Sequence, residues 1–383
     1  MYNYPLQKKY FELFVCKILR PEPVYAYVEK ETSLSNDIVL YSQSKIIETF
    51  KHLNFIEFDE NNEEIEKSFI MEWISSGNIR IYNKVDFIPY NKKKPVVDNI
   101  YNLFRGYNPD CYTYYDKSKK DKLLKPFKDL WLQLCGGNVD HFQYFYNYLG
   151  HLIQYPEERI PICFIFKGKQ GTGKNVALKA IGNLVGNQHY ISSCNPKDFL
   201  GEYAEGFLHK LIVNMNECEG KDTFDFEGKI KGLISDDTVT INQKYIRPII
   251  IAMLARIIIF TNKPNPIPID VKSKERRFVV YQTTDYYLHS KYGTNFWNNI
   301  VKHFNRPDFI ACLYNDLNEL QIDDIDWKGK RPITEAYKEM CKLYVPPEIL
   351  FFEDYCVNKI TINHLATNVY VDSIDISEEG TVY

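Results

Sequence analysis

Short runs of mostly apolar residues recur in the middle of the chain. They cover residues 162–166, 211–215 and 256–260, and a shorter run covers residues 278–280. Apolar runs of this length, bounded by polar or turn-forming residues, are typical of strands that are buried on both faces, as in parallel sheets. The pattern therefore predicts an α/β fold in which a parallel sheet is flanked by helices.

Apolar residues at helical spacing lie on both sides of these runs. Helices are predicted within residues 131–154, 296–304 and 309–320, and a further helix over residues 41–50. The first part of the chain is set apart by the lysine-rich segment 91–95, and the prolines at 346 and 347 end the last helical region. The predicted divisions are an N-terminal helical or mixed accessory domain (1–95), a helical region ahead of the apolar runs (96–158), a core that contains these runs (159–284), a C-terminal helical lid (285–345), and a tail or further module (346–383).

The strand over residues 162–166 leads into the most informative segment, Gly168–Asn175, which reads GKQGTGKN. A strand, a glycine-rich loop and a helix starting near Asn175 form the context of a phosphate-binding P-loop, in which backbone N–H groups and the helix N-terminus surround phosphates. Lys174 then supplies a positive charge to the β- and γ-phosphates, whereas Asn175 stands where a magnesium-binding Ser or Thr is usual. The alternative is a strand–helix turn without a ligand. The predicted nucleotide contacts are Gly168, Lys169, Gln170, Gly171, Thr172, Gly173, Lys174, Asn175 and Val176.

Three further elements fit phosphoryl-transfer chemistry. The strand over 211–215 ends in Asn216 and Glu217, and a carboxylate at that place polarises the attacking water or holds a metal through water. The strand over 256–260 is followed by Asn262, which either orients water or only forms a turn before prolines. The pair Arg276 and Arg277 precedes the last apolar run, where it is either a solvated edge or a source of arginine fingers.

The order of these elements resembles superfamily 3 helicases, a viral and plasmid branch of the AAA+ ATPases. The nearest resemblance is to the helicase part of poxvirus-type and phage primase-helicases, and it spans about residues 80–350. Segments 101–106, 134–138, 151–157 and 331–335 add to it. The resemblance implies that residues 96–158 form a helical collar used in oligomerisation and that residues 159–284 form the AAA+ ATPase core.

This resemblance implies a homo-oligomer, a hexameric ring with ATP and Mg²⁺ at each subunit interface. Lys174, Asn175, Glu217 and Asn262 would lie on one side of the nucleotide, and Arg276 or Arg277 would come from the neighbouring subunit. The implied metal site consists of Asn175, Asn216 and Glu217. A hairpin over residues 238–248 would enter the channel, where Lys244 and Arg247 contact single-stranded or forked DNA; a solvent-facing Lys244 is the alternative. A primase or polymerase is a further expected partner.

Composition limits where nucleic acid can bind. With 47 basic and 50 acidic residues the formal net charge is -3, so any DNA contact requires a local basic patch. One such cluster, six lysines between residues 117 and 128, adjoins Tyr112, Tyr114, Tyr115 and Phe127, and single-strand stacking or a solvated helix start are both compatible with it. The nine cysteines form no C-x-x-C pair, which indicates neither a zinc site nor a disulfide framework.

No transmembrane segment or signal peptide is expected from the sequence. We therefore expect an intracellular, reducing compartment: the host cytoplasm, the nucleus or a viral replication site.

The sequence thus predicts an ATP-dependent DNA helicase that acts in the replication of a viral, phage or mobile-element genome. A packaging ATPase or an RNA helicase would share the same motifs. An ATP-binding ring that serves as a scaffold for a primase or polymerase, with weak or no unwinding, is the alternative from another class. The substitutions at Asn175 and Asn216 are its support. A monomeric nucleotide kinase fits less well, because it has no use for arginines placed for a neighbour.

Overall fold

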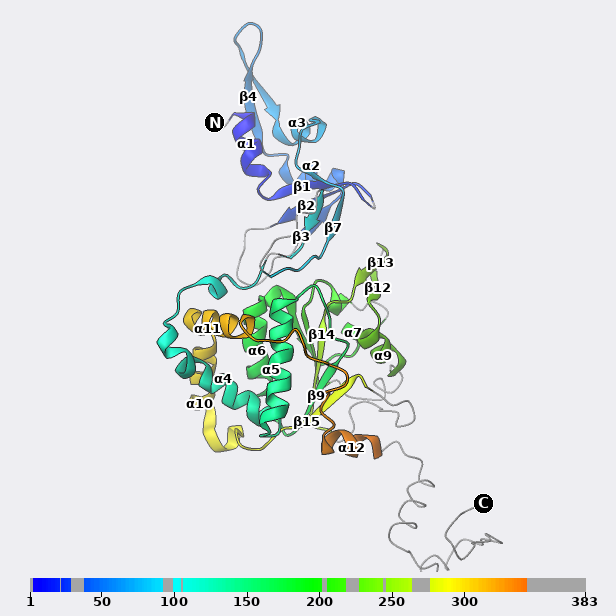
Figure 1. Ribbon diagram of the computed structural model, residues 1–383. Coiled ribbons are helices and arrows are strands. Elements are labelled where there is room, and N and C mark those ends of the chain that lie inside the picture. The colour runs from blue at the N-terminus through cyan, green and yellow to red at the C-terminus, as the bar shows by residue number, and fades with distance from the viewer. Residues whose placement is uncertain are drawn as a thin grey trace, which may run out of the picture.

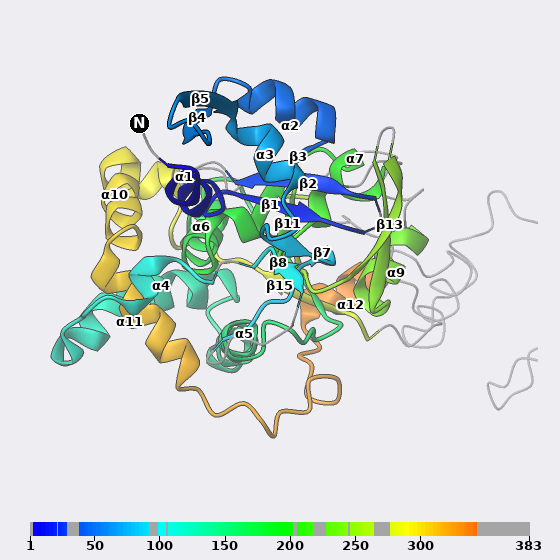
Figure 2. The same cartoon turned by 90° about the horizontal axis from the view of Figure 1, so that it is seen from above.

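The protein folds into a smaller N-terminal body and a larger C-terminal body, which are stacked along the long axis of the molecule (Figure 1). The computed structural model describes residues 3–20, 22–28, 38–91, 99–104, 106–201, 205–217, 227–243, 246–263 and 276–342. Figure 2 looks along the same axis and shows the N-terminal body lying over the sheet of the larger body.

The N-terminal body is mixed α/β. Its four-stranded sheet has the order β3-β2-β1-β6. Three short helices pack against it, and a hairpin extends from its far end (Figure 1). The elements are α1 (Tyr4–Phe11), β1 (Val15–Ile18), β2 (Val24–Val28), β3 (Ile38–Tyr41), α2 (Gln43–Phe50), β4 (Asn54–Phe58), β5 (Glu64–Ser68), α3 (Phe69–Ser75) and β6 (Ile81–Tyr82). An aromatic core holds them together, with Phe11 packed edge-on against Trp73 at 5.0 Å between ring centroids.

One predicted boundary in this body is wrong. The helix expected over residues 41–50 begins at Gln43, because residues 38–41 pair with β2 as an edge strand. The hydroxyl of Ser42 then accepts the N–H of Lys45 and caps the helix.

The larger body is built on a five-stranded parallel sheet with the order β10-β11-β14-β9-β15. Its strands are β9 (Cys163–Lys167), β10 (Tyr190–Ser193), β11 (Ile212–Asn216), β14 (Arg256–Thr261) and β15 (Phe278–Gln282). The apolar runs of the sequence correspond to β9, β11, β14 and β15, which confirms the predicted parallel sheet. β9 lies between β14 and β15, so a loop that leaves its carboxyl end has a strand end on either side.

Alternate residues of the buried strands face two separate cores. Phe164 and Phe166 of β9 pack with helices α4 (Lys120–Leu134), α5 (Val139–Gln154), α6 (Lys174–Val185) and α11 (Pro307–Asn318). Cys163 and Ile165 face the other way, toward helices α7 (Lys197–Leu200), α9 (Glu227–Ser235) and α12 (Glu335–Lys342). This two-faced burial explains why the strand sequences are mostly apolar instead of alternating, since neither face of the strand meets water.

The predicted helices after the sheet are present as α10 (His289–Phe304) and α11. α11 packs with α4 and α5 in one core, so helices from the predicted collar and the predicted lid are joined in a single layer. A parallel strand pair, β7 (Lys84–Asp86) and β8 (Ile100–Asn102), packs on the N-terminal sheet through Val85 and Tyr101. The side chain of Asn91 accepts a hydrogen bond from Tyr314 on α11 (2.7 Å), which ties the N-terminal segment to the larger body.

An antiparallel hairpin projects from the larger body on the side away from α10 and α11 (Figures 1 and 2). It consists of β12 (Thr238–Gln243) and β13 (Ile246–Ala252), which confirms a hairpin at the predicted place, although its second strand extends beyond the predicted end at residue 248. In the part of the chain that the structure describes, every helix is too short or too polar to cross a bilayer.

Candidate functional site

The glycine-rich loop Gly168–Gly173 connects the carboxyl end of β9 to helix α6, which begins at Lys174. Gly173 has a left-handed φ of 89°, and a Cβ there would lie 2.3 Å from the ring of Trp297. A Cβ on Gly168 would lie 1.8 Å from the hydroxyl oxygen of Thr283. Both positions therefore require glycine, because the loop is covered closely by the segment after β15.

The start of helix α6 leaves backbone donors available. Its N-cap residue is Gly173, and no side chain caps the helix. The N–H groups of the first helical turn have no intrahelical acceptor, and the helix dipole places positive charge at this end. The loop therefore has the local structure of an anion-binding helix start.

Lys174 is folded back over the loop. Its side chain is only 6% exposed, and its ammonium donates to the carbonyl oxygens of Gly168 (2.9 Å) and Lys169 (2.8 Å). Burial lowers the pKa of Lys174, and the nearby Glu217 carboxylate opposes that shift. No carboxylate in the described ranges forms a close ion pair with Lys174, so its charge is compensated by the two carbonyl dipoles and, at longer range, by Glu217.

Glu217 faces the loop from the end of β11. Its backbone has a left-handed φ of 49°, and its N–H donates to the carbonyl oxygen of Phe260 on β14 (2.8 Å). The amide of Gln170 donates to the two carboxylate oxygens of Glu217, at 3.2 and 3.4 Å. A positive φ is uncommon for a residue with a Cβ, and such backbone conformations concentrate at functional sites.

The predicted asparagines lie around the same edge of the sheet. Asn175 is exposed in the first turn of α6, Asn216 is half-buried at the end of β11, and Asn262 is exposed one residue after β14. The carbonyl oxygen of Thr261 accepts the N–H of Gly168 (2.9 Å), so the strand that carries Asn262 is bonded directly to the glycine-rich loop. The structure thus brings Lys174, Glu217 and the three asparagines to one edge.

The arginine pair lies at the opposite edge. Arg276 and Arg277 precede β15, and β15 runs parallel to β9, so the pair lies at the amino ends of the strands. A five-residue strand is about 16 Å long, so neither arginine is next to the loop of its own chain. Arg277 donates its Nε–H to the hydroxyl of Ser235 (2.6 Å), whereas Arg276 is exposed.

The hairpin residues are described only in part. Lys244 lies outside the described residues. Arg247 lies on β13, but its side chain is likewise outside them. On the same strand Ile250 is 72% exposed, so the hairpin offers an apolar side chain to its surroundings.

A second wall of the site was not predicted from the sequence. The segment after β15 contacts the loop at several points: Lys169 pairs with Asp285 (2.5 Å), and the N–H of His289 donates to the carbonyl of Gly171 (2.9 Å). A cavity of about 300 Å³ opens between α4 and α10, and two of its lining residues, Leu130 and Trp297, lie close to Gly173. Its lining residues are Lys122, Lys125, Pro126, Asp129, Leu130, Tyr287, Phe296, Trp297 and Ile300. The one available signal was the density of aromatic residues between 286 and 297.

The chain itself offers few side chains that could bind a metal ion. Within the described residues, no cluster of three or more His, Cys, Asp or Glu side chains could hold a metal ion. Glu217 supplies one carboxylate at the loop, and Asn175 and Asn216 supply amide oxygens. This set fits Mg²⁺, which usually keeps several waters and takes one or two carboxylates together with substrate phosphates.

Comparison with known proteins relates the chain to a phage replication protein. A family model described as a family of unknown function, DUF5906, matches residues 166–277. The DNA primase-polymerase of Nitratiruptor phage NrS-1 is 30% identical over 158 residues, which cover 40% of this chain and 21% of that protein. The aligned part is thus about a fifth of that relative's length.

Solved structures of the NrS-1 C-terminal region share the fold. One apo structure gives a TM-score of 0.67 at 18% identity and covers 94% of this chain and 80% of that chain. A second, A-form apo structure gives 0.66 at 19% identity, with coverage of 92% and 80%. The fold of the present chain, with both bodies included, is therefore similar to the fold of the NrS-1 C-terminal region.

Proposed function

We propose that this chain is an ATP-dependent DNA helicase of the superfamily 3 type, built on an AAA+ ATPase core and active in phage or viral genome replication. The observation that carries the proposal is the position of Lys174. Its partly desolvated ammonium lies in a glycine-rich loop at the carboxyl edge of a parallel sheet, with Glu217 opposite. The relationship to a phage DNA primase-polymerase supports DNA as the substrate.

Lys174 and the start of α6 would bind the phosphates. An ammonium has three donors, and two of them are used by the carbonyls of Gly168 and Lys169. The third is left for a phosphate oxygen, since the Thr172 hydroxyl is 3.5 Å away and a weak partner. Uncapped N–H groups at the helix start would contact the same phosphates.

Glu217 would act on the attacking water. Its carboxylate is held at the loop by Gln170 and by its own backbone bond to β14, so it can accept a proton or orient water beside the γ-phosphate. Asn262, one residue beyond the strand bonded to Gly168, would contact the γ-phosphate or that water. Mg²⁺ would neutralise developing charge on the phosphates, with Asn175, Asn216 and Glu217 as the chain's ligands.

The cavity beside Gly173 would hold the base of the nucleotide. Two of its lining residues, Leu130 and Trp297, lie close to Gly173 of the loop, and Tyr287, Phe296 and Trp297 give it an aromatic wall. A pocket with apolar walls and a few polar groups is the usual form of a small-ligand site. The segment after β15 would then contribute to ATP binding as well as to packing.

An arginine from a neighbouring subunit would complete each site. The arginine pair lies a strand length from the loop of the same chain, so it can reach a γ-phosphate only across an interface. Arg276 is the better candidate, because Arg277 already bonds to Ser235. The site is therefore complete only in an oligomer, which we propose to be a hexameric ring with the β12–β13 hairpin, including Lys244 and Arg247, directed at DNA.

Strand displacement on a labelled fork tests this function. The protein should separate forked DNA only with ATP and Mg²⁺, and Lys174→Ala should abolish separation while the fold is retained. Separation of RNA forks in preference to DNA forks would favour an RNA helicase. Hydrolysis without separation of either would favour a packaging-type motor.

A scaffold remains the second candidate, favoured by the uncharged residues Asn175 and Asn216 at the proposed metal site. An ATP-binding ring that supports a primase or polymerase needs nucleotide affinity but little turnover. Tight ATP binding with a hydrolysis rate that Glu217→Gln does not alter would support it.

A further inference from the structure

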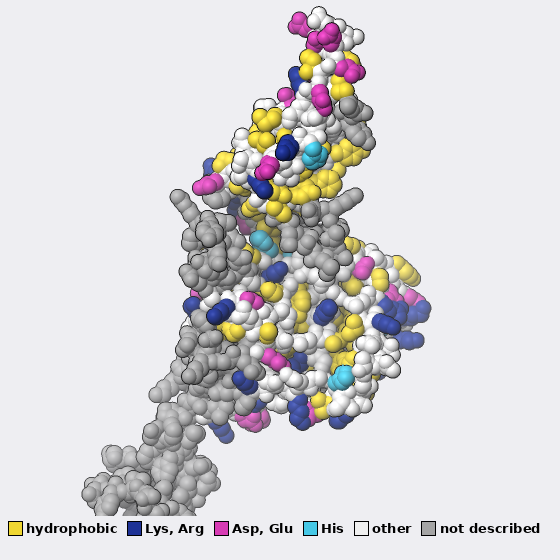
Figure 3. Space-filling model, turned by 180° about the vertical axis from the view of Figure 1, so that it is seen from behind, with side chains coloured by type: hydrophobic (Ala, Val, Ile, Leu, Met, Phe, Trp, Pro, Cys, Tyr) yellow, Lys and Arg dark blue, Asp and Glu magenta, His cyan; other side chains and the backbone are white. Residues whose placement is uncertain are grey.

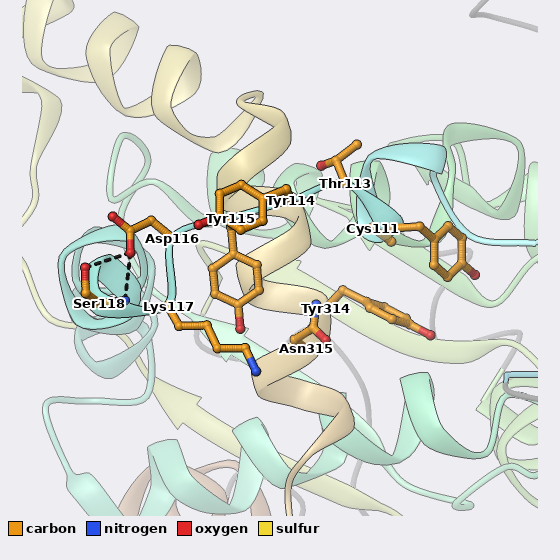
Figure 4. Close-up of a pocket in the computed structure, with 10 residues that line it drawn as sticks. Cys111, Thr113, Tyr114, Tyr115, Asp116, Lys117, Ser118, Tyr314 and Asn315 are labelled. Carbon is orange, nitrogen blue, oxygen red and sulfur yellow. Dashed lines mark hydrogen bonds between the residues drawn. The ribbon is translucent and has the colours of Figure 1, made fainter.

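A groove lined by tyrosines lies on the larger body, away from the glycine-rich loop. We call it the tyrosine groove; it has a volume of about 600 Å³ and is lined by residues 111–118 together with Tyr314 and Asn315 of α11. Figure 4 shows its side chains, with Lys117 extending along the groove toward Asn315. A volume of this size is within the range of small-ligand pockets and accommodates a nucleotide.

Two tyrosines of the groove expose more of their surface than packing within the fold requires. Tyr114 is 87% exposed and Tyr112 is 62% exposed, whereas Tyr115 is buried. The ring of Tyr112 packs edge-on against Tyr314 at 5.5 Å between centroids, which fixes its orientation. Exposed aromatic rings held in place on a surface are characteristic of stacking platforms for nucleic-acid bases.

The loop that carries these rings is rigidly built. Asn108 caps η1 (Pro109–Tyr112) by accepting the N–H of Asp110 (2.9 Å), and Asp116 caps η2 (Lys117–Lys119) by accepting the N–H of Ser118 (3.0 Å). The hydroxyl of Thr113 donates to the carbonyl of Asp110 (2.8 Å). The exposed rings are therefore presented by an ordered backbone, which limits the entropy lost when a ligand stacks on them.

Positive charge adjoins the groove. Among the described residues no carboxylate pairs with Lys117, which lines the groove, whereas Lys120 and Lys128 pair with Asp316 at 2.8 Å each. Asp116 is itself compensated by Ser118 and by Lys119 (3.1 Å), and these bonds lower the pKa of its carboxyl. Figure 3 shows Lys and Arg side chains gathered at the edge of the larger body on which η2 and the start of α4 lie.

These lysines are not explained by helix stability. Lysines at 117, 119, 120 and 122 lie at or before the first turn of α4, where the helix dipole favours acidic residues. Their positions are unfavourable for the helix but favourable for a polyanion. A protein partner with an apolar surface would not require them.

We propose that the tyrosine groove binds single-stranded nucleic acid, with bases stacked on Tyr112 and Tyr114 and a phosphate beside Lys117. The polar side chains of Thr113, Ser118 and Asn315 line the same space and can meet base edges or phosphates. Because every base has a π-face, such a site tolerates many sequences. The β12–β13 hairpin lies on the opposite side of the larger body (Figures 1 and 2), so the groove is a second contact and separate from the hairpin.

The proposal extends the proposed function but does not require ATP hydrolysis, so the test omits nucleotide. Fluorescence anisotropy of a labelled oligothymidine measures affinity for the wild type, Tyr114→Ala, Tyr114→Phe and the control Tyr10→Ala. Tyr10 is an exposed tyrosine (59%) on the N-terminal body. We expect Tyr114→Ala to weaken binding about 10-fold, and Tyr114→Phe and Tyr10→Ala to bind as the wild type does.

Two further readouts locate the contact. Lys117→Ala should lower affinity and reduce the slope of log affinity against log salt by about 1. An oligonucleotide carrying 5-iodouridine should cross-link to the peptide that contains Tyr112 and Tyr114. Oligouridine should lose affinity in Tyr114→Ala as oligothymidine does; a loss confined to one of them would assign the groove to that nucleic acid.

Unchanged affinity of Tyr114→Ala for both oligonucleotides would overturn the proposal, as would a wild type that binds neither. Such results would leave the tyrosines as a surface for a protein partner. ATP hydrolysis that persists in Tyr114→Ala separates this outcome from a failure of the proposed ATPase site.

Discussion

The Nε2 amide of Gln170 lies 3.2 Å from the Oε2 oxygen of Glu217, and this contact joins the glycine-rich loop to the strand end that carries the carboxylate. The two residues are 47 positions apart in sequence, and they meet because β14 separates β9 from β11 by one strand. The contact holds Glu217 beside the place where the γ-phosphate would lie. Gln170 therefore has a second proposed role, which is to hold Glu217 in place, in addition to its proposed contact with the nucleotide.

Glu217→Gln should separate binding from turnover. The amide retains the size of the side chain but cannot accept the proton of the attacking water, so we expect at least a hundredfold lower ATP hydrolysis with nearly unchanged nucleotide affinity. Gln170→Ala should give a smaller loss, because Glu217 remains but loses one hydrogen-bonding partner. Single-turnover hydrolysis and binding of a fluorescent nucleotide measure the two quantities. A Glu217→Gln protein with wild-type turnover would exclude Glu217 as the water-activating group.

Arg276 should act across the subunit interface. Arg276→Ala should lower turnover about a thousandfold or more with little change in stability, because the residue is exposed and an arginine finger acts on the transition state. Arg277→Ala should mainly lower stability, since it removes the bond to Ser235.

Mixing inactive subunits tests this directly. Lys174→Ala retains its arginine, and Arg276→Ala retains its loop, so a mixed ring contains some complete interfaces. We expect partial activity in the mixture although each variant alone is inactive. A mixture as inactive as its components, with proven subunit exchange, would contradict sites shared in this way.

Gly173→Ala should destabilise the larger body. The left-handed backbone costs a residue with a Cβ about 1–2 kcal/mol, and the new Cβ would displace Trp297, so we expect a loss of at least about 2 kcal/mol in the free energy of unfolding. Gly228→Ala is the matched control, because no atom lies within 4 Å of a Cβ at that helical position. Urea unfolding of the three proteins measures the difference. Equal losses at both positions would contradict the close packing of Trp297 on the loop.

Stability should fall below neutral pH because two histidines are buried and a third, His209, is half-buried. Burial lowers the pKa of His151 to about 3, and those of His189 and His209 to about 4. The unfolded chain binds protons near pH 6.5 whereas the folded chain does not, so this contribution is complete above pH 6.5 and is lost as pH falls toward 4. Each such histidine lowers stability by up to about 1.4 kcal/mol per pH unit in that window.

Urea unfolding between pH 7 and pH 5 measures this slope. His189→Phe should make the slope shallower, because the ring lies against Phe104 (5.0 Å between centroids) and a phenyl ring does not titrate. His52→Gln, on an exposed turn, is the control and should leave the slope unchanged. If His189→Phe does not alter the slope, His189 binds its proton as readily in the folded protein as in the unfolded chain.

The sequence predicted those parts of the fold and site that depend on local patterns. Strands β9, β11 and β14 could be recognised because both faces are buried, and the glycine-rich loop because its backbone admits few other residues. Edge strand β3 was mistaken in part for the helix that follows it. The sequence could not show which aromatic neighbours of the lysine cluster are exposed. Phe127 is fully buried and cannot stack on a base, while Tyr114 is almost fully exposed.

Contacts between distant segments could not be predicted from the sequence. Nothing near Gly173 indicates that Trp297 covers it, and nothing near Arg277 indicates Ser235 as its partner. These pairs arise from the way α10 and α9 pack, and only the folded chain brings them together. The side-chain positions at the arginine pair therefore favour Arg276 for the proposed role, a choice that spacing had left open.

The most direct test of the account is the rate of ATP hydrolysis for the wild type and Lys174→Ala, with and without single-stranded DNA, over a range of protein concentrations. An oligomeric DNA-dependent ATPase predicts a rate per subunit that rises with DNA and with protein concentration and disappears in Lys174→Ala. A wild-type rate at background despite tight ATP binding, or a rate that Lys174→Ala retains, would contradict it.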